Sequence, residues 1–245
     1  ILSYCVSDWI KDCIVSGLSS GEGLIWAVRD PIMKREPIKS KGKVVGYQDV
    51  EVDAGISDKR LLVIEPEFGR TLKVMGRDGN TLSAVARQSW DTGNLRVLTK
   101  NIPAKATSAH ISILGHITRE ELLRDMDSTE TANGFANRFL WVLVKRSKVL
   151  PEGGFLPDDE LKRFAAALER VIEFARGIGE LRRNPEAKEI WASVYPKLSE
   201  GLPGLVGAVT NRAEAQVIRL SCIYAIMDCS PMIKAAHLLA ALAFW

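Results

Sequence analysis

The chain has 245 residues, 47% of them hydrophobic, with a formal net charge of +3 and an isoelectric point near 8.7. These totals describe an ordinary globular protein with room for one large domain, or for one domain and a helical appendage. The mildly basic charge is compatible with nucleic acid without requiring it, and no apolar run reaches the roughly 18 residues of a membrane span.

The four cysteines form no C-x-x-C pair, so neither a zinc site nor a disulfide framework is indicated. Free thiols favour a cytoplasmic protein. Both ends of the chain fall inside a helical pattern, and Ile1 is not a methionine. We therefore expect the chain to be a piece of a longer protein.

Residues 1–15 have helical spacing, and a loop of three serines and three glycines follows at residues 16–23, before a second helix at 24–29. A Ser/Gly loop that leads into a helix presents free backbone N–H groups that suit a phosphate. An ordinary helix cap gives the same pattern, so both interpretations stay open. The candidate phosphate contacts are Ser19, Ser20 and Gly21.

The G-x-x-x-x-G-K-[ST] pattern of a phosphate-binding loop occurs nowhere in the chain. Glu22 instead places a carboxylate in the Ser/Gly loop, where a lysine would be expected to bind phosphate. The functional interpretation of Glu22 is therefore a carboxylate that orients a water molecule near a phosphate.

Residues 31–60 are basic and are interrupted by prolines and a glycine, which predicts a surface excursion with a strand near residues 44–50. Basic loops beside a nucleotide site can contact nucleic acid, and Lys34 and Arg35 are the candidates. A solvated loop with no binding role has the same composition.

In residues 61–69, four apolar residues run into Glu65 and Glu67. Such a short apolar run predicts a strand buried on both faces. Carboxylates just past the strand lie at the carboxyl edge of a sheet, where α/β proteins bind ligands. An acid there can hold Mg²⁺ through water or polarise the attacking water in nucleotide hydrolases. The alternative is a buried strand that ends in two solvated acids.

Residues 70–88 are predicted to be helical, with a break at residues 76–79. Two further apolar strands are predicted, at residues 108–118 and 139–144. The first ends in His116 and Thr118, and Thr118 also has the capping-box spacing to Glu121. Arg138 directly precedes the second strand. It can pair with a carboxylate at the sheet edge, or reach a γ-phosphate as an arginine finger.

The composition changes at residues 150–157, and helical patterns follow at 158–178, 185–199, 213–227 and 233–245. We therefore predict an α/β core at residues 1–152 and an α-helical domain at residues 153–245. Within the second domain, Arg212 and Arg219 can be interpreted as phosphate sensors or as part of a helix-surface salt bridge.

Three polar clusters thus adjoin predicted strands in order: an acidic pair and a His/Thr end after two strands, and then an arginine before the last strand. This order resembles that of RecA-like P-loop ATPases. The motifs resemble more specifically the helicase-like ATPase domains in replication proteins of phages, plasmids and other mobile elements, often downstream of a primase–polymerase region. The matching stretches, which cover nearly the whole chain, are Gly17-Leu-Ser-Ser-Gly-Glu-Gly-Leu24, Val28-Arg-Asp-Pro31, Lys59-Arg-Leu-Leu-Val-Ile-Glu-Pro-Glu-Phe68, Ile113-Leu-Gly-His-Ile-Thr118, Asn133-Gly-Phe-Ala-Asn-Arg-Phe139, Asn211-Arg-Ala-Glu-Ala-Gln-Val-Ile-Arg-Leu220, Tyr224-Ala225 and His237-Leu-Leu-Ala-Ala241.

The resemblance implies an α/β fold with a mostly parallel, RecA-like (P-loop NTPase) sheet that is incomplete at its N-terminus, followed by an α-helical region. It implies ATP and Mg²⁺ as cofactors and DNA as a partner. The phosphate-binding loop of the family would lie upstream of this chain in the same polypeptide. The chain alone is therefore expected to hydrolyse little or no ATP.

The resemblance also implies roles for single residues. Glu65 and Glu67 resemble the acidic strand end, with Glu65 holding Mg²⁺ through water, although Pro66 departs from the usual adjacent acids. His116 and Thr118 resemble a sensor of the γ-phosphate. Arg138 resembles the finger arginine, which in ring-shaped ATPases acts on the nucleotide of a neighbouring subunit. Glu22 is the candidate for activating water.

Three hypotheses of function follow. The first is the body of an ATP-dependent, helicase-like motor in the DNA replication of a mobile element. The second is a non-catalytic module on a degenerate ATPase fold, which binds DNA or a protein, or forms oligomers. The third is an unrelated enzyme that uses His110 or His116 together with the carboxylates.

Overall fold

The computed structural model describes residues 1–98, 104–126 and 128–245. The chain forms two compact units. We call Lys11–Phe135 the core unit, and Ile1–Ile10 together with Ala136–Trp245 the helical unit. The compact units therefore change at residues 135–136, whereas composition placed the domain boundary near residue 152. The assignment of two domains at 1–152 and 153–245 stays a prediction.

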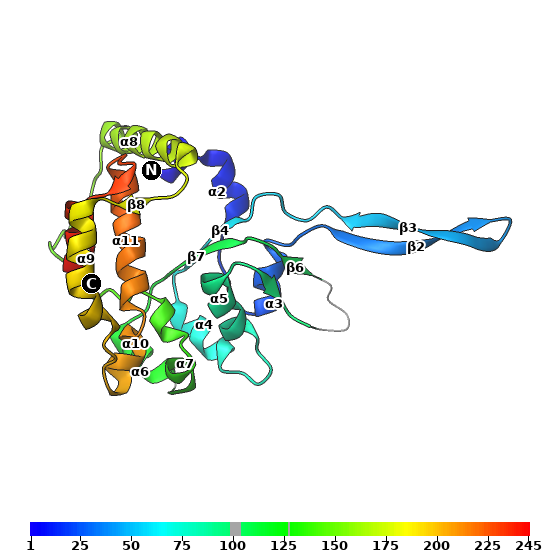
Figure 1. Ribbon diagram of the computed structural model, residues 1–245, viewed down its shortest axis with the longest axis horizontal. Helices are drawn as coiled ribbons and strands as arrows, with labels where there is room; N and C mark the ends of the chain where they lie inside the picture. Colours follow the sequence, from blue (N-terminus) through cyan, green and yellow to red (C-terminus); the bar gives the residue numbers. More distant parts are fainter. Residues whose placement is uncertain (99–103, 127) are drawn as a thin grey trace. The chain divides into compact units, whose positions relative to one another are not determined.

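A small parallel sheet lies at the centre of the core unit (Figure 1). Its strands are β1 (Ile14–Val15), β4 (Arg60–Glu65) and β7 (His110–Gly115), in the spatial order β1-β4-β7. Both pairings are parallel, and Glu65 stands opposite Gly115. The predicted strands near residues 61–65 and 108–118 are thus present and adjacent, and they form a mixed α/β fold together with the helices around them.

The helices of the core unit are short and amphipathic. They are α2 (Ser7–Cys13, which begins in the helical unit), α3 (Gly21–Trp26), α4 (Phe68–Met75), α5 (Leu82–Asp91), α6 (Arg119–Asp125) and α7 (Ser128–Ala132). Ile25, Phe68 and Leu82 of these helices are fully buried, as is Val63 of β4, and all four belong to the hydrophobic core. The predicted break between α4 and α5 is confirmed, and it contains Gly79 with φ of +77°.

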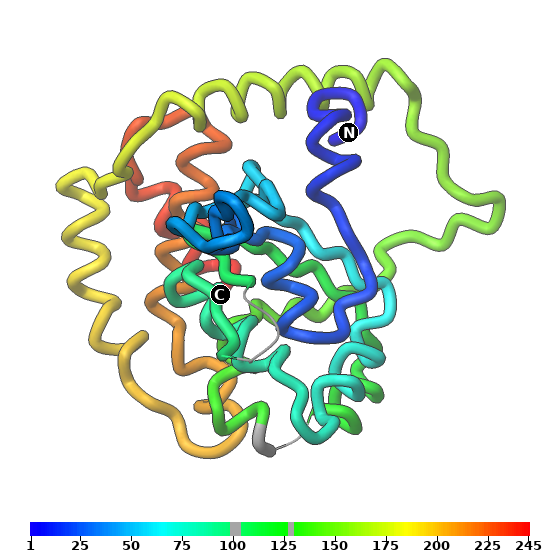
Figure 2. The backbone as a smooth tube through the Cα atoms, turned by 90° about the vertical axis from the view of Figure 1, so that its right-hand side faces the viewer, coloured from blue at the N-terminus to red at the C-terminus, as the bar shows by residue number. Residues whose placement is uncertain are grey.

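The predicted surface excursion is a long antiparallel hairpin of β2 (Ile32–Ser40) and β3 (Lys43–Asp53). The predicted strand near residues 44–50 is present as part of β3, whereas its partner β2 was not predicted. The hairpin forms because Lys41 and Gly42 both have positive φ, of 46° and 78°, as a two-residue turn between strands requires. It projects from the rest of the core unit in Figure 1 and is seen end-on in Figure 2. A second, short hairpin joins β5 (Leu95–Arg96) to β6 (Lys105–Ala106).

The helical unit confirms the predicted C-terminal helical region. It contains α1 (Leu2–Cys5), η1 (Ala136–Arg138, a 3-10 turn), α8 (Asp158–Gly177), β8 (Arg182–Arg183), α9 (Pro185–Ser199), α10 (Gly204–Thr210), α11 (Ala213–Met227), β9 (Met232–Ile233) and α12 (Ala235–Phe244). Its core is a cluster that includes Val217 of α11 and Leu238 of α12, both fully buried. The two-residue strands β8 and β9 pair in parallel directly before α9 and α12.

Two sequence predictions of secondary structure are wrong. Residues 1–15 form two short helices and β1 instead of one helix, because Val6, with φ of −143°, leaves the helical conformation. Residues 139–144 are irregular instead of a third buried strand, and Leu143 and Val144 are 81% and 80% exposed. An apolar run becomes a strand only when another strand pairs with it, and within the described ranges none pairs with this one.

None of the helices that the structure describes is long and apolar enough to cross a membrane.

Candidate functional site

The carboxyl ends of the three parallel strands bring three of the predicted polar clusters to one edge of the core unit. The Ser/Gly loop follows β1, Glu65 ends β4, and His116 follows β7. We call this the carboxyl edge. The strands run parallel in one sheet, so the predicted clusters at Glu65 and His116 lie at the same edge, and the Ser/Gly loop joins them there. The third predicted cluster, Arg138, does not adjoin a strand, because residues 139–144 form none. The binding roles of all these residues stay predictions.

Glu65 connects the three clusters through hydrogen bonds. Its carboxylate Oε1 accepts a hydrogen bond from the backbone N–H of Leu18, in the Ser/Gly loop, at 2.5 Å. Its main-chain oxygen accepts from the N–H of His116 at 2.9 Å. Glu65 is only 7% exposed, so these contacts take the place of bulk water. A carboxylate has about four acceptor positions, so the bond to Leu18 uses a fraction of its capacity.

Glu67 has a different environment, although it is only two residues away. It is exposed and precedes the first residue of α4, where its side chain makes no capping hydrogen bond. Next to it, the buried Phe68 donates its N–H to the main-chain oxygen of His116 at 2.8 Å. The ring of Phe68 also fills the space beside Gly115, where a Cβ atom would lie 2.7 Å from it. Glu65 therefore faces the interior of the edge and Glu67 faces solvent.

The Ser/Gly loop is held by the start of α5. The Asn80 side-chain amide donates to the main-chain oxygen of Ser19 at 2.9 Å, and Thr81 Oγ1 donates to Glu22 Oε2 at 2.9 Å. Gly21 packs closely against the start of α5, because a Cβ atom at this position would lie only 2.5 Å from Thr81 Oγ1. Ser20 caps α3, with its Oγ accepting from the N–H of Gly23 at 3.0 Å. The capping interpretation of the loop is thus confirmed, while its phosphate-binding role stays a prediction.

The structural interpretation of Thr118 is also confirmed. Its Oγ1 accepts from the N–H of Glu121 at 3.2 Å, and its own N–H donates to the Glu121 carboxylate at 3.4 Å, which completes a capping box at the start of α6. His116 and Thr118 are both exposed at the carboxyl edge. His110 begins β7 and so lies at the opposite end of that strand from His116. The two histidines therefore do not share the edge.

No group of three or more His, Cys, Asp or Glu side chains is arranged to hold a metal ion in the part of the chain that the structure describes. Mg²⁺ commonly uses only one or two carboxylates and completes its coordination with water and substrate phosphates. Among the three candidate carboxylates, Glu65 fits that arrangement best, because it is fixed at the edge by Leu18.

Arg138 belongs to the helical unit, at the end of η1. The residue before it, Asn137, is buried and accepts a hydrogen bond from Arg212 Nε at 3.1 Å. Two of the predicted phosphate contacts, Arg138 and Arg212, are therefore linked through a residue that the sequence analysis missed. An asparagine beside an arginine gives no signal of its own, because its burial depends on helices that are more than 65 residues away in the chain.

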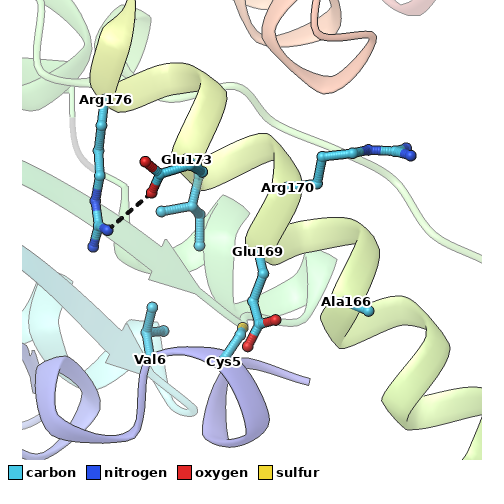
Figure 3. Close-up of a pocket in the computed structure, with 8 residues that line it drawn as sticks. Cys5, Val6, Ala166, Glu169, Arg170, Glu173 and Arg176 are labelled. Carbon is cyan, nitrogen blue, oxygen red and sulfur yellow. Dashed lines mark hydrogen bonds and ion pairs between the residues drawn. The ribbon is translucent and has the colours of Figure 1, made fainter.

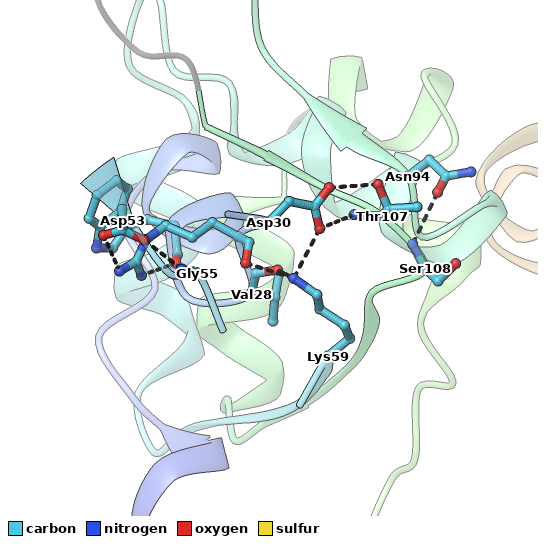
Figure 4. A network of polar contacts seen from close by, with 10 residues as sticks. Val28, Asp30, Asp53, Gly55, Lys59, Asn94, Thr107 and Ser108 are labelled. Atoms are coloured by element: carbon cyan, nitrogen blue, oxygen red, sulfur yellow. Dashed lines mark hydrogen bonds and ion pairs between the residues drawn. The ribbon is translucent and has the colours of Figure 1, made fainter. Parts of the chain in front are cut away.

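The root of the β2–β3 hairpin contains a dense polar network (Figure 4). Lys59 Nζ lies 3.0 Å from Asp30 Oδ1 and donates to the main-chain oxygens of Val28 and Arg29 at 2.9 and 2.6 Å. Asp30 also accepts from the N–H and Oγ1 of Thr107. Burial by itself raises the pKa of Asp30, but the hydrogen bonds from Thr107 and Lys59 outweigh burial and leave this pKa below its ordinary value.

The predicted nucleic-acid contacts Lys34 and Arg35 lie on β2. Lys34 is well exposed and lies 3.4 Å from the Glu36 carboxylate, and Arg35 stands over the ring of Tyr47 at 5.2 Å. Farther along the hairpin, residues 37–48 include Lys39, Lys41 and Lys43 and no acidic residue. We call residues 37–48 the hairpin tip. Positive charge is thus unopposed at the tip and partly neutralised nearer the root.

A surface pocket in the helical unit contains none of the predicted site residues (Figure 3). It is formed by the chain around α1 and by one face of α8, and its charged side chains include Glu173 and Arg176, which lie 3.4 Å apart as an ion pair. The pocket is therefore not part of the candidate site at the carboxyl edge.

No protein-family model matches the chain, and no curated protein matches it. Among solved structures, the chain is similar to a full-length MCM homolog from Methanopyrus kandleri, with a TM-score of 0.39 and 16% sequence identity. The match covers 95% of this chain and 49% of that protein, so the chain spans about half the length of the MCM homolog. The likeness is a distant structural resemblance between mixed α/β folds with helical regions.

Proposed function

We propose that this chain is part of an ATP-dependent, helicase-like ATPase that acts in the DNA replication of a mobile element. In this proposal the carboxyl edge of the core unit forms one wall of the nucleotide site, and the upstream portion of the same polypeptide supplies the phosphate-binding loop. The observation that carries the proposal is the hydrogen bond from the Leu18 N–H to Glu65 Oε1, because it fixes a buried carboxylate beside a Ser/Gly loop at a ligand-binding edge.

The roles of the residues follow from their positions. Glu65 would hold a water molecule of the Mg²⁺ shell, and the ion would neutralise charge on the phosphates when bound. The exposed side chains of His116 and Thr118 would report on the γ-phosphate at the same edge. Glu67 and Glu22 remain candidates for orienting the attacking water, with Glu22 already tied to Thr81. Arg138 would act on the nucleotide of a neighbouring subunit in a homo-oligomeric ring.

DNA is the proposed macromolecular partner, and the hairpin is the element that supports it. A projecting hairpin whose tip has three lysines and no acid suits a phosphate backbone, which attracts positive charge regardless of base sequence. The lysines of the tip are better placed for this contact than Lys34, which already lies beside Glu36. Binding of this kind would fall steeply as salt concentration rises.

One observation favours a second candidate, a non-catalytic module on a degenerate ATPase fold. Glu22, Glu65 and Thr118 each make hydrogen bonds within the core unit that account for their presence without a nucleotide. In this alternative the polar residues of the carboxyl edge only stabilise the fold of the core unit, and the hairpin alone binds DNA.

The decisive test is ATP hydrolysis by the full-length protein with and without DNA, comparing the parent with Glu65→Gln, Glu67→Gln and Arg138→Ala. Loss of one electrostatic group that acts in the transition state is expected to lower kcat by about 10²-fold or more. Glu152→Gln, an exposed carboxylate outside the site, is the matched control. If the parent hydrolyses ATP and all three variants match it, the proposed site is wrong. Nucleotide binding without turnover would favour the non-catalytic module.

A further inference from the structure

The turn that bears Arg138 has little structure of its own. It is a three-residue 3-10 turn, η1, in which the N–H of Phe139 donates to the main-chain oxygen of Ala136 at 3.3 Å. The same oxygen accepts from Trp141 Nε1 at 2.9 Å. A single 3-10 turn is short and has poor hydrogen-bond geometry. Its orientation, and with it the direction of the Arg138 backbone, must therefore be set by the groups packed around it.

Asn137, in the middle of the turn, provides several of those contacts. Asn137 is 7% exposed. Both the oxygen and the nitrogen of its side-chain amide are hydrogen-bonded, one to the residue before α11 and the other to α10. The amide oxygen accepts from Arg212 Nε at 3.1 Å, and the amide nitrogen donates to the main-chain oxygen of Ala208, in α10, at 3.3 Å. A buried amide that loses such partners leaves unsatisfied polar groups, which is costly. The position thus requires a donor and an acceptor together.

Two residues at the start of α11, Arg212 and Gln216, contact Asn137. Arg212 is the residue that precedes α11, and Gln216 lies one turn further on, with its N–H bonded to the oxygen of Arg212 at 3.0 Å. Gln216, which is also buried, donates its side-chain amide to the main-chain oxygen of Asn137 at 3.4 Å. The start of α11 therefore holds Asn137 by its side chain and by its backbone, and one residue connects the Arg138 turn to Arg212.

We propose that Asn137 is a positioning residue that holds Arg138 and Arg212 in a fixed mutual arrangement, as a pair of guanidinium groups for the phosphates of one nucleotide. This inference rests on the proposed function, because it takes Arg138 to be the group that acts on ATP. A displacement of about 1 Å in a positioned group costs on the order of 10²-fold in rate. Loss of Asn137 should therefore act on turnover through the arginines, beyond any effect on stability.

The test is a double-mutant cycle measured as kcat and KM for ATP in the full-length protein. Asn137→Ala is combined with Arg138→Lys, which keeps the charge and leaves turnover measurable. We expect Asn137→Ala alone to lower kcat by about ten-fold or more with KM nearly unchanged. In the Arg138→Lys background the same substitution should have less than about two-fold effect, since residues that act as a unit are not additive. The cycle is repeated with Arg212→Lys, where the same loss of effect is expected.

The matched control is Asn184→Ala. Asn184 is another asparagine of the helical unit, whose side-chain oxygen accepts from the N–H of Ala187 at 2.9 Å as the cap of α9. Its loss should lower the unfolding temperature and leave kcat unchanged. If Asn137→Ala does not fold, Asn137→Asp takes its place in the cycle, because aspartate keeps the shape and the acceptor toward Arg212 but not the donor toward Ala208.

The outcomes separate the two proposals. If Arg138→Ala lowers kcat while Asn137→Ala matches the parent, or if the Asn137 and Arg138 effects multiply independently, the positioning role is wrong and the proposed function stands. If the parent protein hydrolyses no ATP, or Arg138→Ala matches it, the proposed role of Arg138 fails and this inference fails with it.

Discussion

Arg29 and Asp53 form a two-point ion pair across the root of the β2–β3 hairpin. Arg29 Nε donates to Asp53 Oδ1 and Arg29 Nη2 to Asp53 Oδ2, both at 2.8 Å. Arg29 lies just before β2 and Asp53 ends β3, so the pair joins the two sides of the hairpin at its root. An isolated two-stranded hairpin is marginally stable in water. This contact, together with Lys59 and Asp30, therefore fixes the base from which the tip projects.

The ion pair predicts an acid-sensitive hairpin root. The hydrogen bonds from Arg29 hold the pKa of Asp53 below its ordinary value. A carboxyl group whose pKa is lowered in the folded state stabilises that state above its ordinary pKa, near 4, and loses the effect as pH falls through the folded pKa. Hydrogen exchange of the β2 and β3 amides should therefore show less protection in Asp53→Asn than in the parent at neutral pH. The difference between the two should shrink below about pH 4. Equal protection at neutral pH would contradict the prediction.

Lys59 is expected to be the most sensitive residue of the root network. Its ammonium group contacts the carboxylate of Asp30 and two main-chain oxygens, and its side chain is only 23% exposed. Lys59→Met removes all three contacts and should lower the free energy of unfolding of the cooperative core by about 2 kcal/mol. Denaturant titration measures the change. Lys73→Met is the control, because Lys73 is 59% exposed and lies 3.7 Å from Asp125. That surface pair should contribute less than about 1 kcal/mol.

Gly21 is predicted to be irreplaceable for steric reasons. A Cβ atom there would lie 2.6 Å from Val85 Cγ2 and 2.9 Å from the main-chain oxygen of Thr81, and the backbone oxygen cannot rotate away. Gly21→Ala should therefore destabilise the core unit by about 1–3 kcal/mol, as overpacking does. Gly177→Ala at the end of α8, where no atom lies within 4 Å, should be neutral or slightly stabilising. Similar unfolding temperatures for the two variants would contradict the steric argument.

The lysines of the hairpin tip predict how the affinity for DNA depends on salt concentration. Replacing Lys39, Lys41 and Lys43 together with glutamine should weaken DNA binding and reduce the slope of log K against log salt by about 2–3. Fluorescence anisotropy with single-stranded and double-stranded DNA between low and moderate salt measures that slope. The control replaces three exposed lysines of the helical unit, Lys162, Lys188 and Lys197, and changes net charge equally. If only the control variant loses affinity, the DNA contact lies in the helical unit instead of at the tip.

Several elements could be predicted from local sequence because local physics produces them. The apolar run before Glu65 is a strand, although only alternate residues of it are fully buried. The Thr118–Glu121 spacing forms a capping box, and the glycine-containing break separates α4 from α5. In each case the signal and the structure involve residues close together in the chain, so side-chain periodicity and capping chemistry suffice. The parallel pairing of β1, β4 and β7 was expected only from the resemblance to RecA-like ATPases.

Other features were decided by contacts between distant residues. The apolar segment at 139–144 is irregular because a strand depends on a partner that no local pattern supplies. The two acids near the end of β4 look alike in sequence, yet Glu65 is buried and bonded to Leu18 while Glu67 is exposed.

The sequence by itself therefore determined which residues carry charge at the ends of the strands, since composition and periodicity are local properties. Only the tertiary structure decided that Glu65 is the carboxylate bonded to the Ser/Gly loop and that Asn137 links Arg138 to Arg212. Glu65 and its partner Leu18 are 47 residues apart in the chain, and Asn137 and its partner Arg212 are 75 residues apart. Pairings over such separations are fixed by the packing of whole elements.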